Sequence, residues 1–285
     1  MKTLDRREAL RLAGLGITSA LAYAADFKDP QTVAKKPQNP FRGLKVGLAS
    51  YSTRKLSVEQ TIACCKRIGI RYITLKDFHC KMDTTREERQ AVRKKFSDAG
   101  IEVVGCGVIY LKNDETEIRK ALEYVRDLGA NTAVVGCDAK TVPALEKVIK
   151  DFDIRAAIHN HGPEDRLGAF SPLDVMGWLK GVDSKIGLCL DTGHTFRCGV
   201  DFVAAARTCA SRLYDVHQKD LDVATTKGKG VPMGQGVLDC VGFLRMLVKI
   251  KYAHHVALEY EVDADDPVPG IAESIGFTRG VLSSI

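Results

Sequence analysis

Two histidines in one short segment are the first residues of this chain that could do chemistry. The segment AAIHNHGPED, residues 156–165, places His159 and His161 on either side of Asn160, after an apolar run and before a Gly-Pro turn. An imidazole in such a place can bind a metal, move a proton or pack in a core. The choice among these uses depends on which other polar side chains the fold brings near it.

Other apolar runs of the chain also end in polar groups. GLCLDTGH carries Asp191 and His194, DVHQKD carries His217 and Lys219, and VALEYE carries Glu259. Two imidazoles and two carboxylates form a donor set that suits Mn, Co, Zn or Fe, and suits Mg less well. These residues are not spaced as a local metal motif, so only the fold can bring them together.

Short β-branched runs alternate with helical segments from residue 44 onward. Strands are expected at Lys45–Ser50, Tyr72–Phe78, Glu102–Tyr110, Thr132–Cys137, Ala156–His159, Gly187–Asp191, Leu213–His217 and Val256–Tyr260. Helices are expected at residues 57–68, 85–99, 114–128, 142–151, 171–181, 201–211, 239–250 and 269–282. This alternation predicts an α/β fold, a single-domain (β/α)8 TIM barrel. An open doubly wound sheet is the alternative, but it should show a Gly-rich fingerprint after its first strand, where this chain has SYSTRKL.

In a TIM barrel, chemistry takes place at the carboxyl ends of the strands and in the loops that follow them. The last four strands are neighbours, so their terminal side chains can share one coordination sphere. The expected ligands of one divalent metal ion are therefore His159, Asp191, His217 and Glu259. Four more polar residues near strand ends are candidates for substrate contact: Asp77, His79, Tyr110 and Arg197.

Five motifs resemble those of the xylose-isomerase-like TIM barrels, the superfamily of sugar (phosphate) isomerases and epimerases. They are IHNHG (158–162), GLCLDTGH (187–194), DVHQKD (215–220), GQGVLD (234–239) and ALEYE (257–261). The resemblance implies one divalent metal held by an acidic residue from the middle of the barrel and by an Asp, a His and a Glu from its last three strands. By position, these places fall on His159, Asp191, His217 and Glu259.

The first of these places departs from the family pattern. The usual motif reads ENHG, whose Glu binds the metal and also serves as an acid/base group in the epimerases, and this chain has HNHG with His159. An imidazole that binds a metal through one nitrogen carries a proton on the other, so it is a poor general base. Proton transfer then falls to His161, His194 or Lys219, or to the free oxygen of Glu259. If His159 is not a ligand, it could itself be the base.

The leading interpretation is a metal-dependent sugar isomerase or epimerase, which abstracts a proton next to a carbonyl of a sugar or keto-sugar. Two alternatives stay open. Loss of a β-substituent after the same proton abstraction would make the protein a lyase or hydratase on 3-keto-glycosides or inosose-like substrates. The His159 change could instead leave a non-catalytic sugar-binding barrel.

Charge and hydropathy limit the classes of partner. Residues 1–40 hold seven Lys or Arg and four Asp or Glu, so they supply +3 of the formal net charge of +6. The rest of the chain therefore carries only +3, which is too little for the basic surface of a nucleic-acid-binding protein. No apolar run of about 18 residues is present, so we expect no membrane span in the mature protein.

The nine cysteines are scattered and are interpreted as small buried hydrophobes. The expected partner is a small sugar or keto-sugar, and a homo-oligomer is compatible with the sequence.

The N-terminal segment has the features of an export signal. Arg6 and Arg7 precede a weakly apolar stretch that ends near the small-residue segment 22–24, so residues 1–25 resemble a twin-arginine signal. Residues 26–43 are rich in Pro and Lys and are predicted to be a linker, and residues 44–285 are predicted to form the barrel. We therefore expect an exported, periplasmic protein, with a cytoplasmic protein as the alternative.

Overall fold

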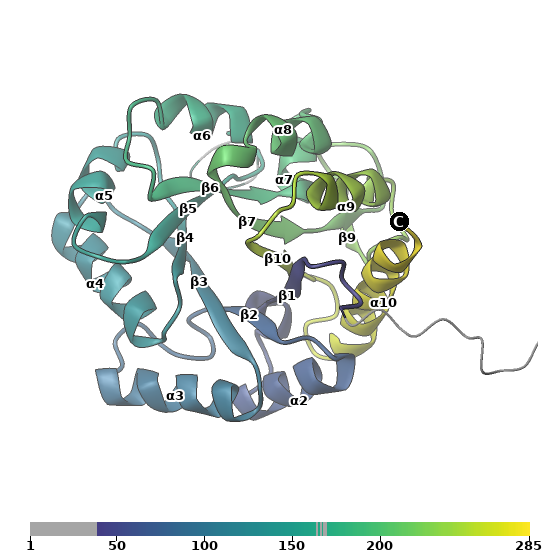
Figure 1. The fold of residues 1–285 in the computed structure, drawn as a ribbon, viewed down its shortest axis with the longest axis horizontal. Helices are drawn as coiled ribbons and strands as arrows, with labels where there is room; N and C mark the ends of the chain where they lie inside the picture. Colours follow the sequence, from purple (N-terminus) through teal and green to yellow (C-terminus); the bar gives the residue numbers. More distant parts are fainter. Residues whose placement is uncertain (1–38, 164, 166, 168–169) are drawn as a thin grey trace, which may run out of the picture. The chain divides into compact units, whose positions relative to one another are not determined.

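A computed structural model describes residues 39–163, 165, 167 and 170–285 of the chain. Within these residues, eight parallel strands close into a barrel in the order β1-β10-β7-β6-β5-β4-β3-β2, with helices around the outside (Figure 1). The strands are β1 (Lys45–Ala49), β2 (Tyr72–Leu75), β3 (Glu102–Tyr110), β4 (Thr132–Gly136), β5 (Arg155–His159), β6 (Ile186–Asp191), β7 (Leu213–Gln218) and β10 (His255–Leu258). This confirms the predicted single-domain TIM barrel.

The helices follow the strands as the periodicity predicts. They are α2 (Val58–Ile68), α3 (Arg86–Asp98), α4 (Glu115–Asp127), α5 (Val142–Ile149), α6 (Pro172–Trp178), α7 (Thr192–Arg197), α8 (Phe202–Thr208), α9 (Cys240–Lys249) and α10 (Val268–Ser284). Local chemistry sets their ends. Ser57 accepts a hydrogen bond from the backbone N–H of Gln60 and so caps α2, and Gly69 ends that helix with φ of 74°, a conformation that glycine adopts without strain.

The strands are buried on both faces, which explains their nearly continuous apolar sequences. All five residues of β4 and all six of β6 are buried between the barrel interior and the surrounding helices. The nine cysteines form no disulfide, and all are buried except Cys198, which is half-buried. Their predicted use as small core residues is confirmed.

The loops on the carboxyl side of the barrel differ from the prediction in two places. Helix α7 begins directly after β6, because the Asp191 carboxylate accepts a hydrogen bond of 2.7 Å from the backbone N–H of His194 and caps the helix. After β7, the two-residue strands β8 (Asp220–Leu221) and β9 (Gly230–Val231) pair antiparallel. Both features shape the loops that follow the strand ends where the polar residues collect.

The predicted export signal, residues 1–25, lies outside the described residues, as does the linker up to residue 38. The remaining linker residues, 39–43, form a turn, and Phe41 is buried with the guanidinium carbon of Arg279 5.4 Å from its ring centroid. This end of the predicted linker therefore packs on the barrel. None of the described helices is both long enough and apolar enough to cross a membrane.

Candidate metal centre and active site

Four side chains from the last four barrel strands converge at one end of the barrel. His159 and Asp191 are the last residues of β5 and β6, His217 lies in β7 opposite Asp191, and Glu259 directly follows β10. One ligand atom from each residue lies within 4.8 Å of those of the other three. All four side chains are buried. The structure thus brings together the four residues that the sequence predicts as metal ligands.

Several buried polar atoms of this cluster make no hydrogen bond of good geometry. They are both ring nitrogens of His159 and of His217, and Oδ2 of Asp191, which has only the Lys219 ammonium 3.3 Å away among the described residues. His159 Nε2 lies 3.5 Å from Asp191 Oδ2, and His217 Nδ1 lies 3.1 Å from Glu259 Oε2 without hydrogen-bond geometry. Each buried polar group left without a partner costs about 1–3 kcal/mol. A divalent ion would satisfy these atoms, and the donor set suits Mn, Co, Zn or Fe.

Lys219 places its ammonium group beside the carboxylates of the cluster. Its Nζ lies 3.3 Å from Asp191 Oδ2, 3.0 Å from Glu259 Oε2 and 3.0 Å from Glu261 Oε1. Burial alone would lower the pKa of Lys219, but the charges of these three carboxylates outweigh it and hold the pKa well above its ordinary value. With no metal ion on these carboxylates, Lys219 is therefore protonated.

The side chains around Lys219 carry a net negative charge that a divalent cation would balance. Asp191, Glu259 and Glu261 carry three negative charges, and the Lys219 ammonium compensates one of them. The two charges that remain equal those of one divalent ion. The observed atoms, chemistry and charge thus fit a divalent metal held by the four-residue cluster.

Glu261 adds a third carboxylate to the contacts of Lys219. Residues two apart share one face of an extended strand, so a Glu at position 261 can lie on the same side as Glu259. Strand β10 ends at Leu258, and the Glu261 carboxylate beyond it contacts Lys219. Sequence reasoning did not include Glu261 among the site residues, although the position two residues after Glu259 is a signal for it.

His161 belongs to a second polar group at the barrel mouth. The Tyr110 hydroxyl lies 3.3 Å from His161 Nε2 and donates a hydrogen bond of 3.1 Å to Asp165 Oδ2, which is itself 3.7 Å from His161 Nε2. Burial, reinforced by His159, lowers the pKa of His161 to about 3, so the imidazole is uncharged at neutral pH. Sequence reasoning missed Asp165, although it lies in the same segment as the two histidines.

His194 and Arg197 approach the same group from α7. Burial is the main reason that the pKa of His194 is lowered to about 3, so this imidazole is also uncharged. Its ring centroid lies 5.8 Å from that of His159 and 5.9 Å from that of His161. Arg197 donates a hydrogen bond of 2.7 Å to the carbonyl of Gly228 and thereby ties α7 to the loop after β7.

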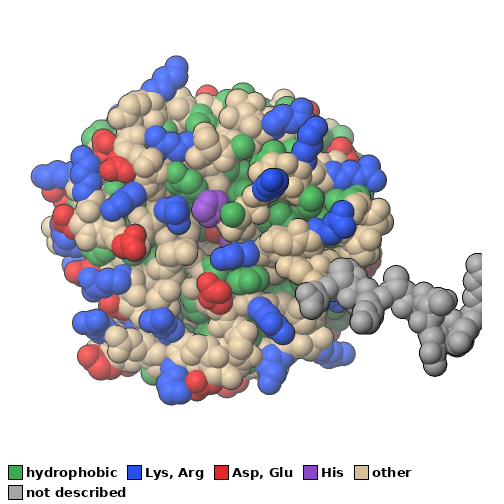
Figure 2. Space-filling view, viewed as in Figure 1, with side chains coloured by type: hydrophobic (Ala, Val, Ile, Leu, Met, Phe, Trp, Pro, Cys, Tyr) green, Lys and Arg blue, Asp and Glu red, His purple; other side chains and the backbone are tan. Residues whose placement is uncertain are grey.

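A cavity of about 380 Å³ opens above the centre. Its polar lining includes Tyr110, His161, His194, Arg197, Lys219 and Glu261, together with His159 and Glu259 of the metal cluster. Figure 2 shows a histidine side chain in the middle of the viewed face, with Lys and Arg side chains around it. The lining has three cationic side chains and three carboxylates, and a polar cavity of this size suits a small substrate with oxygen functions.

Two predicted substrate contacts lie elsewhere. His79 is buried, and its ring nitrogens lie 3.1 Å from Ser50 Oγ and 3.0 Å from Thr61 Oγ1, so it links the end of β1 to α2. Asp77 lies 3.4 Å from the Lys76 ammonium and lines a neighbouring cavity of about 270 Å³. Neither side chain lines the cavity above the metal cluster, so we leave both out of the proposed site.

Comparison with known proteins supports the same architecture. A family model described as xylose isomerase-like TIM barrel matches residues 62–281, and no curated protein matches the chain. A solved IOLI protein with a bound zinc atom has a TM-score of 0.70 and 16% identity, covering 85% of this chain and 99% of its own. L-ribulose 3-epimerase has a TM-score of 0.69 and 17% identity over 85% of this chain and 95% of its own. 3-Keto-D-glucoside 4-epimerase from E. coli has a TM-score of 0.67 and 14% identity over 83% of this chain and 99% of its own. At these identities the likeness concerns the fold.

Proposed function

The chain belongs to the xylose isomerase-like TIM barrel family, and on that premise we propose that it is a metal-dependent sugar isomerase or epimerase. The reaction would remove a proton from the carbon next to a carbonyl of a sugar or keto-sugar. The observation that carries the proposal is the buried cluster of His159, Asp191, His217 and Glu259, whose unpartnered atoms lie beneath a polar cavity. A divalent ion bound there supplies a Lewis acid for the carbonyl oxygen.

Lys219 supplies fixed positive charge to the same cavity. Its ammonium group lines the cavity and contacts Glu261, so it can donate a hydrogen bond to an oxygen that becomes negative when the neighbouring carbon loses its proton. Because Asp191, Glu259 and Glu261 hold the group in place, the charge needs no reorganisation during the reaction. We assign Lys219 to stabilisation of the enediolate and withdraw it as a proton acceptor.

We assign the proton acceptor to His161. Its imidazole lines the cavity, its Nδ1 makes no hydrogen bond to the described residues, and the Asp165 carboxylate 3.7 Å from Nε2 can stabilise the imidazolium that forms. An epimerase also needs a donor on the opposite face of the carbon. His194 lines the same cavity, and its ring centroid is 5.9 Å from that of His161, so the two imidazoles are placed to serve as that pair.

A β-eliminating lyase on 3-keto-glycosides is the second candidate, and one observation favours it. Arg197 lines both the polar cavity and an adjoining cavity of about 760 Å³, whose other lining includes the apolar side chains of Phe196, Val200 and Phe202. This second cavity offers room for the substituent that leaves from a glycoside. The proton abstraction by His161 would be the same, and the product would be unsaturated.

The test is solvent exchange at the carbon next to the carbonyl. Metal-loaded protein is incubated in deuterated water with a panel of ketoses and 3-keto-glycosides, and deuterium at that carbon is followed by nuclear magnetic resonance. We expect exchange with at least one substrate, and we expect His161→Gln to slow it by about 10²–10⁴-fold. The matched control is His254→Gln, because the half-buried His254 precedes β10 at the opposite end of the strand from Glu259. It should keep the wild-type rate.

The products separate the candidates. A stereoisomer or an aldose–ketose pair indicates an isomerase or epimerase, and an unsaturated sugar with a released substituent indicates a lyase. Turnover with neither solvent deuterium nor a primary isotope effect from substrate deuterated at that carbon would contradict proton abstraction. Sugar binding without exchange of any substrate would instead identify a non-catalytic barrel.

A further inference from the structure

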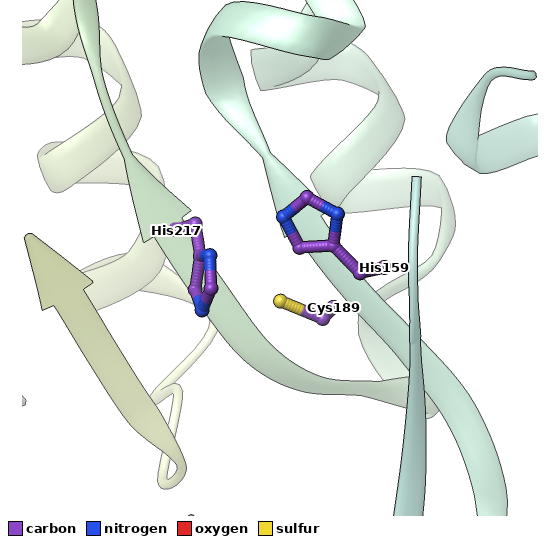
Figure 3. A group of neighbouring side chains, drawn as sticks. All are labelled: His159, Cys189 and His217. Atoms are coloured by element: carbon purple, nitrogen blue, oxygen red, sulfur yellow. The ribbon is translucent and has the colours of Figure 1, made fainter. Parts of the chain in front are cut away.

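Cys189 lies directly beneath the proposed metal centre. It precedes Asp191 by two residues in β6, and side chains at such positions point to the same face of a strand. In the barrel register it is paired with His159 of β5 on one side and with Asp215 of β7 on the other. Figure 3 shows its sulfur between the imidazoles of His159 and His217.

These three residues form a second donor set that shares both histidines with the first. The Cys189 sulfur and one nitrogen each of His159 and His217 all lie within 4.8 Å of one another, and all three side chains are buried. Each imidazole has two nitrogens without a hydrogen-bond partner among the described residues. A neutral imidazole has one lone pair to offer, so each histidine serves a single ion, and Cys189 would be a further ligand of that same ion.

The two sets differ in the metals they favour. Carboxylates with imidazoles accept the harder divalent ions, whereas a thiolate with two imidazoles selects thiophilic ions such as Zn²⁺, Co²⁺ or Cd²⁺ over Mn²⁺ and Mg²⁺. We propose that Cys189 is a metal ligand, which together with His159 and His217 binds a thiophilic ion at the inner side of the centre. As the metal–sulfur bond forms, the thiol proton is released to solvent. The inference deepens the proposed metal-dependent function, since it uses the same two imidazoles.

A purely apolar role for Cys189 is the competing explanation. The residue also packs with the apolar side chains of Val108, Val134, Ala157 and Tyr214 inside the barrel, as a small core residue would. Packing alone, however, does not explain why the sulfur lies between two imidazoles whose ring nitrogens make no hydrogen bond of good geometry with the described residues. A spectroscopic signal of sulfur ligation separates the two explanations, because a packed thiol gives none.

The experiment replaces the native ion by Co²⁺ in the full-length protein after treatment with a chelator. Visible d–d bands report binding at the centre, and a near-ultraviolet sulfur-to-cobalt charge-transfer band reports thiolate ligation. We expect both bands in the wild type, and we expect Cys189→Ser and Cys189→Ala to lose the near-ultraviolet band while they keep the visible bands. The control is Cys198→Ser, which removes the one cysteine that is not buried and should keep both.

Three other results would each contradict the proposal that Cys189 is a metal ligand. Visible bands without the charge-transfer band in the wild type would show a metal centre that does not use Cys189, and the proposed function would stand. A charge-transfer band that survives in both Cys189 variants would place the sulfur ligand elsewhere. Absence of both bands in the wild type would contradict the metal centre itself. Should the variants fail to fold, the cadmium resonance of the Cd²⁺-loaded wild type reports sulfur ligation directly.

Discussion

Replacement of Lys219 by methionine should lower the stability of the metal-free protein. A bound divalent ion should restore most of the lost stability. The change keeps most of the apolar stem and removes the ammonium group that lies 3.3 Å from Asp191 Oδ2 and 3.0 Å from Glu259 Oε2. Both of these carboxylates are buried, so solvent cannot replace the lost charge. The contact with Glu261 counts for little, since that side chain is 38% exposed and is screened by water.

The size of the effect follows from these contacts. Removal of one partner from a buried ion pair costs about 3–5 kcal/mol. In a domain of about 150–250 residues, each kcal/mol shifts the melting temperature by about 2–4 °C. The metal-free variant should therefore melt roughly 6–20 °C below the metal-free wild type. A saturating divalent ion should recover most of this loss, because it compensates the same carboxylates.

Thermal unfolding followed by circular dichroism, in chelator and then in excess Mn²⁺ or Zn²⁺, measures both parts of the prediction. Lys94→Met is the matched control, since the Lys94 pair with Asp98 is exposed and should contribute no more than about 1 kcal/mol. Equal melting temperatures of metal-free Lys219→Met and wild type would refute the reasoning. So would a loss that persists at saturating metal.

Three further predictions concern two single residues and the arginine pair of the N-terminal segment. His79→Ala should lower the free energy of unfolding by about 1–3 kcal/mol, because buried hydrogen bonds are lost. The rate of deuterium exchange into the substrate, per folded molecule, should not change. A slower rate would show that His79 contacts the substrate. Tyr110→Phe should slow exchange about tenfold, the equivalent of one hydrogen bond to His161, with the melting temperature unchanged. Joint replacement of Arg6 and Arg7 by lysine should abolish export in cell fractionation, and undiminished periplasmic protein would contradict the twin-arginine signal.

The fold and the metal cluster could be predicted because each rests on a regular pattern. Buried parallel strands are nearly continuous apolar runs, and their alternation with helical segments leaves little choice of architecture. Once the strands are ordered around a barrel, their carboxyl ends are adjacent, so terminal polar residues such as Asp191 and His217 must lie near one another. No side-chain geometry was needed for that conclusion.

The surroundings of the cluster depend on details that such patterns do not carry. Glu261 contacts Lys219 from beyond the end of β10 at Leu258, and strand ends are set by tertiary packing rather than by the apolar run. His79 follows a strand end as the catalytic candidates do, yet it turns away to hydrogen bonds with Ser50 and Thr61 that only the fold creates. The position of a polar residue along the chain therefore indicates the end of the barrel on which it lies, and not the direction of its side chain.

The most direct test of the central claim is the metal content of the purified protein after reconstitution and removal of unbound ions. The wild type should retain close to one equivalent of a divalent ion at the four-residue cluster, and Asp191→Ala and Glu259→Ala should each retain far less. Glu102→Ala, a change of an exposed carboxylate at the start of β3, should retain as much metal as the wild type. Unchanged metal content in both Asp191→Ala and Glu259→Ala would contradict the four-ligand centre.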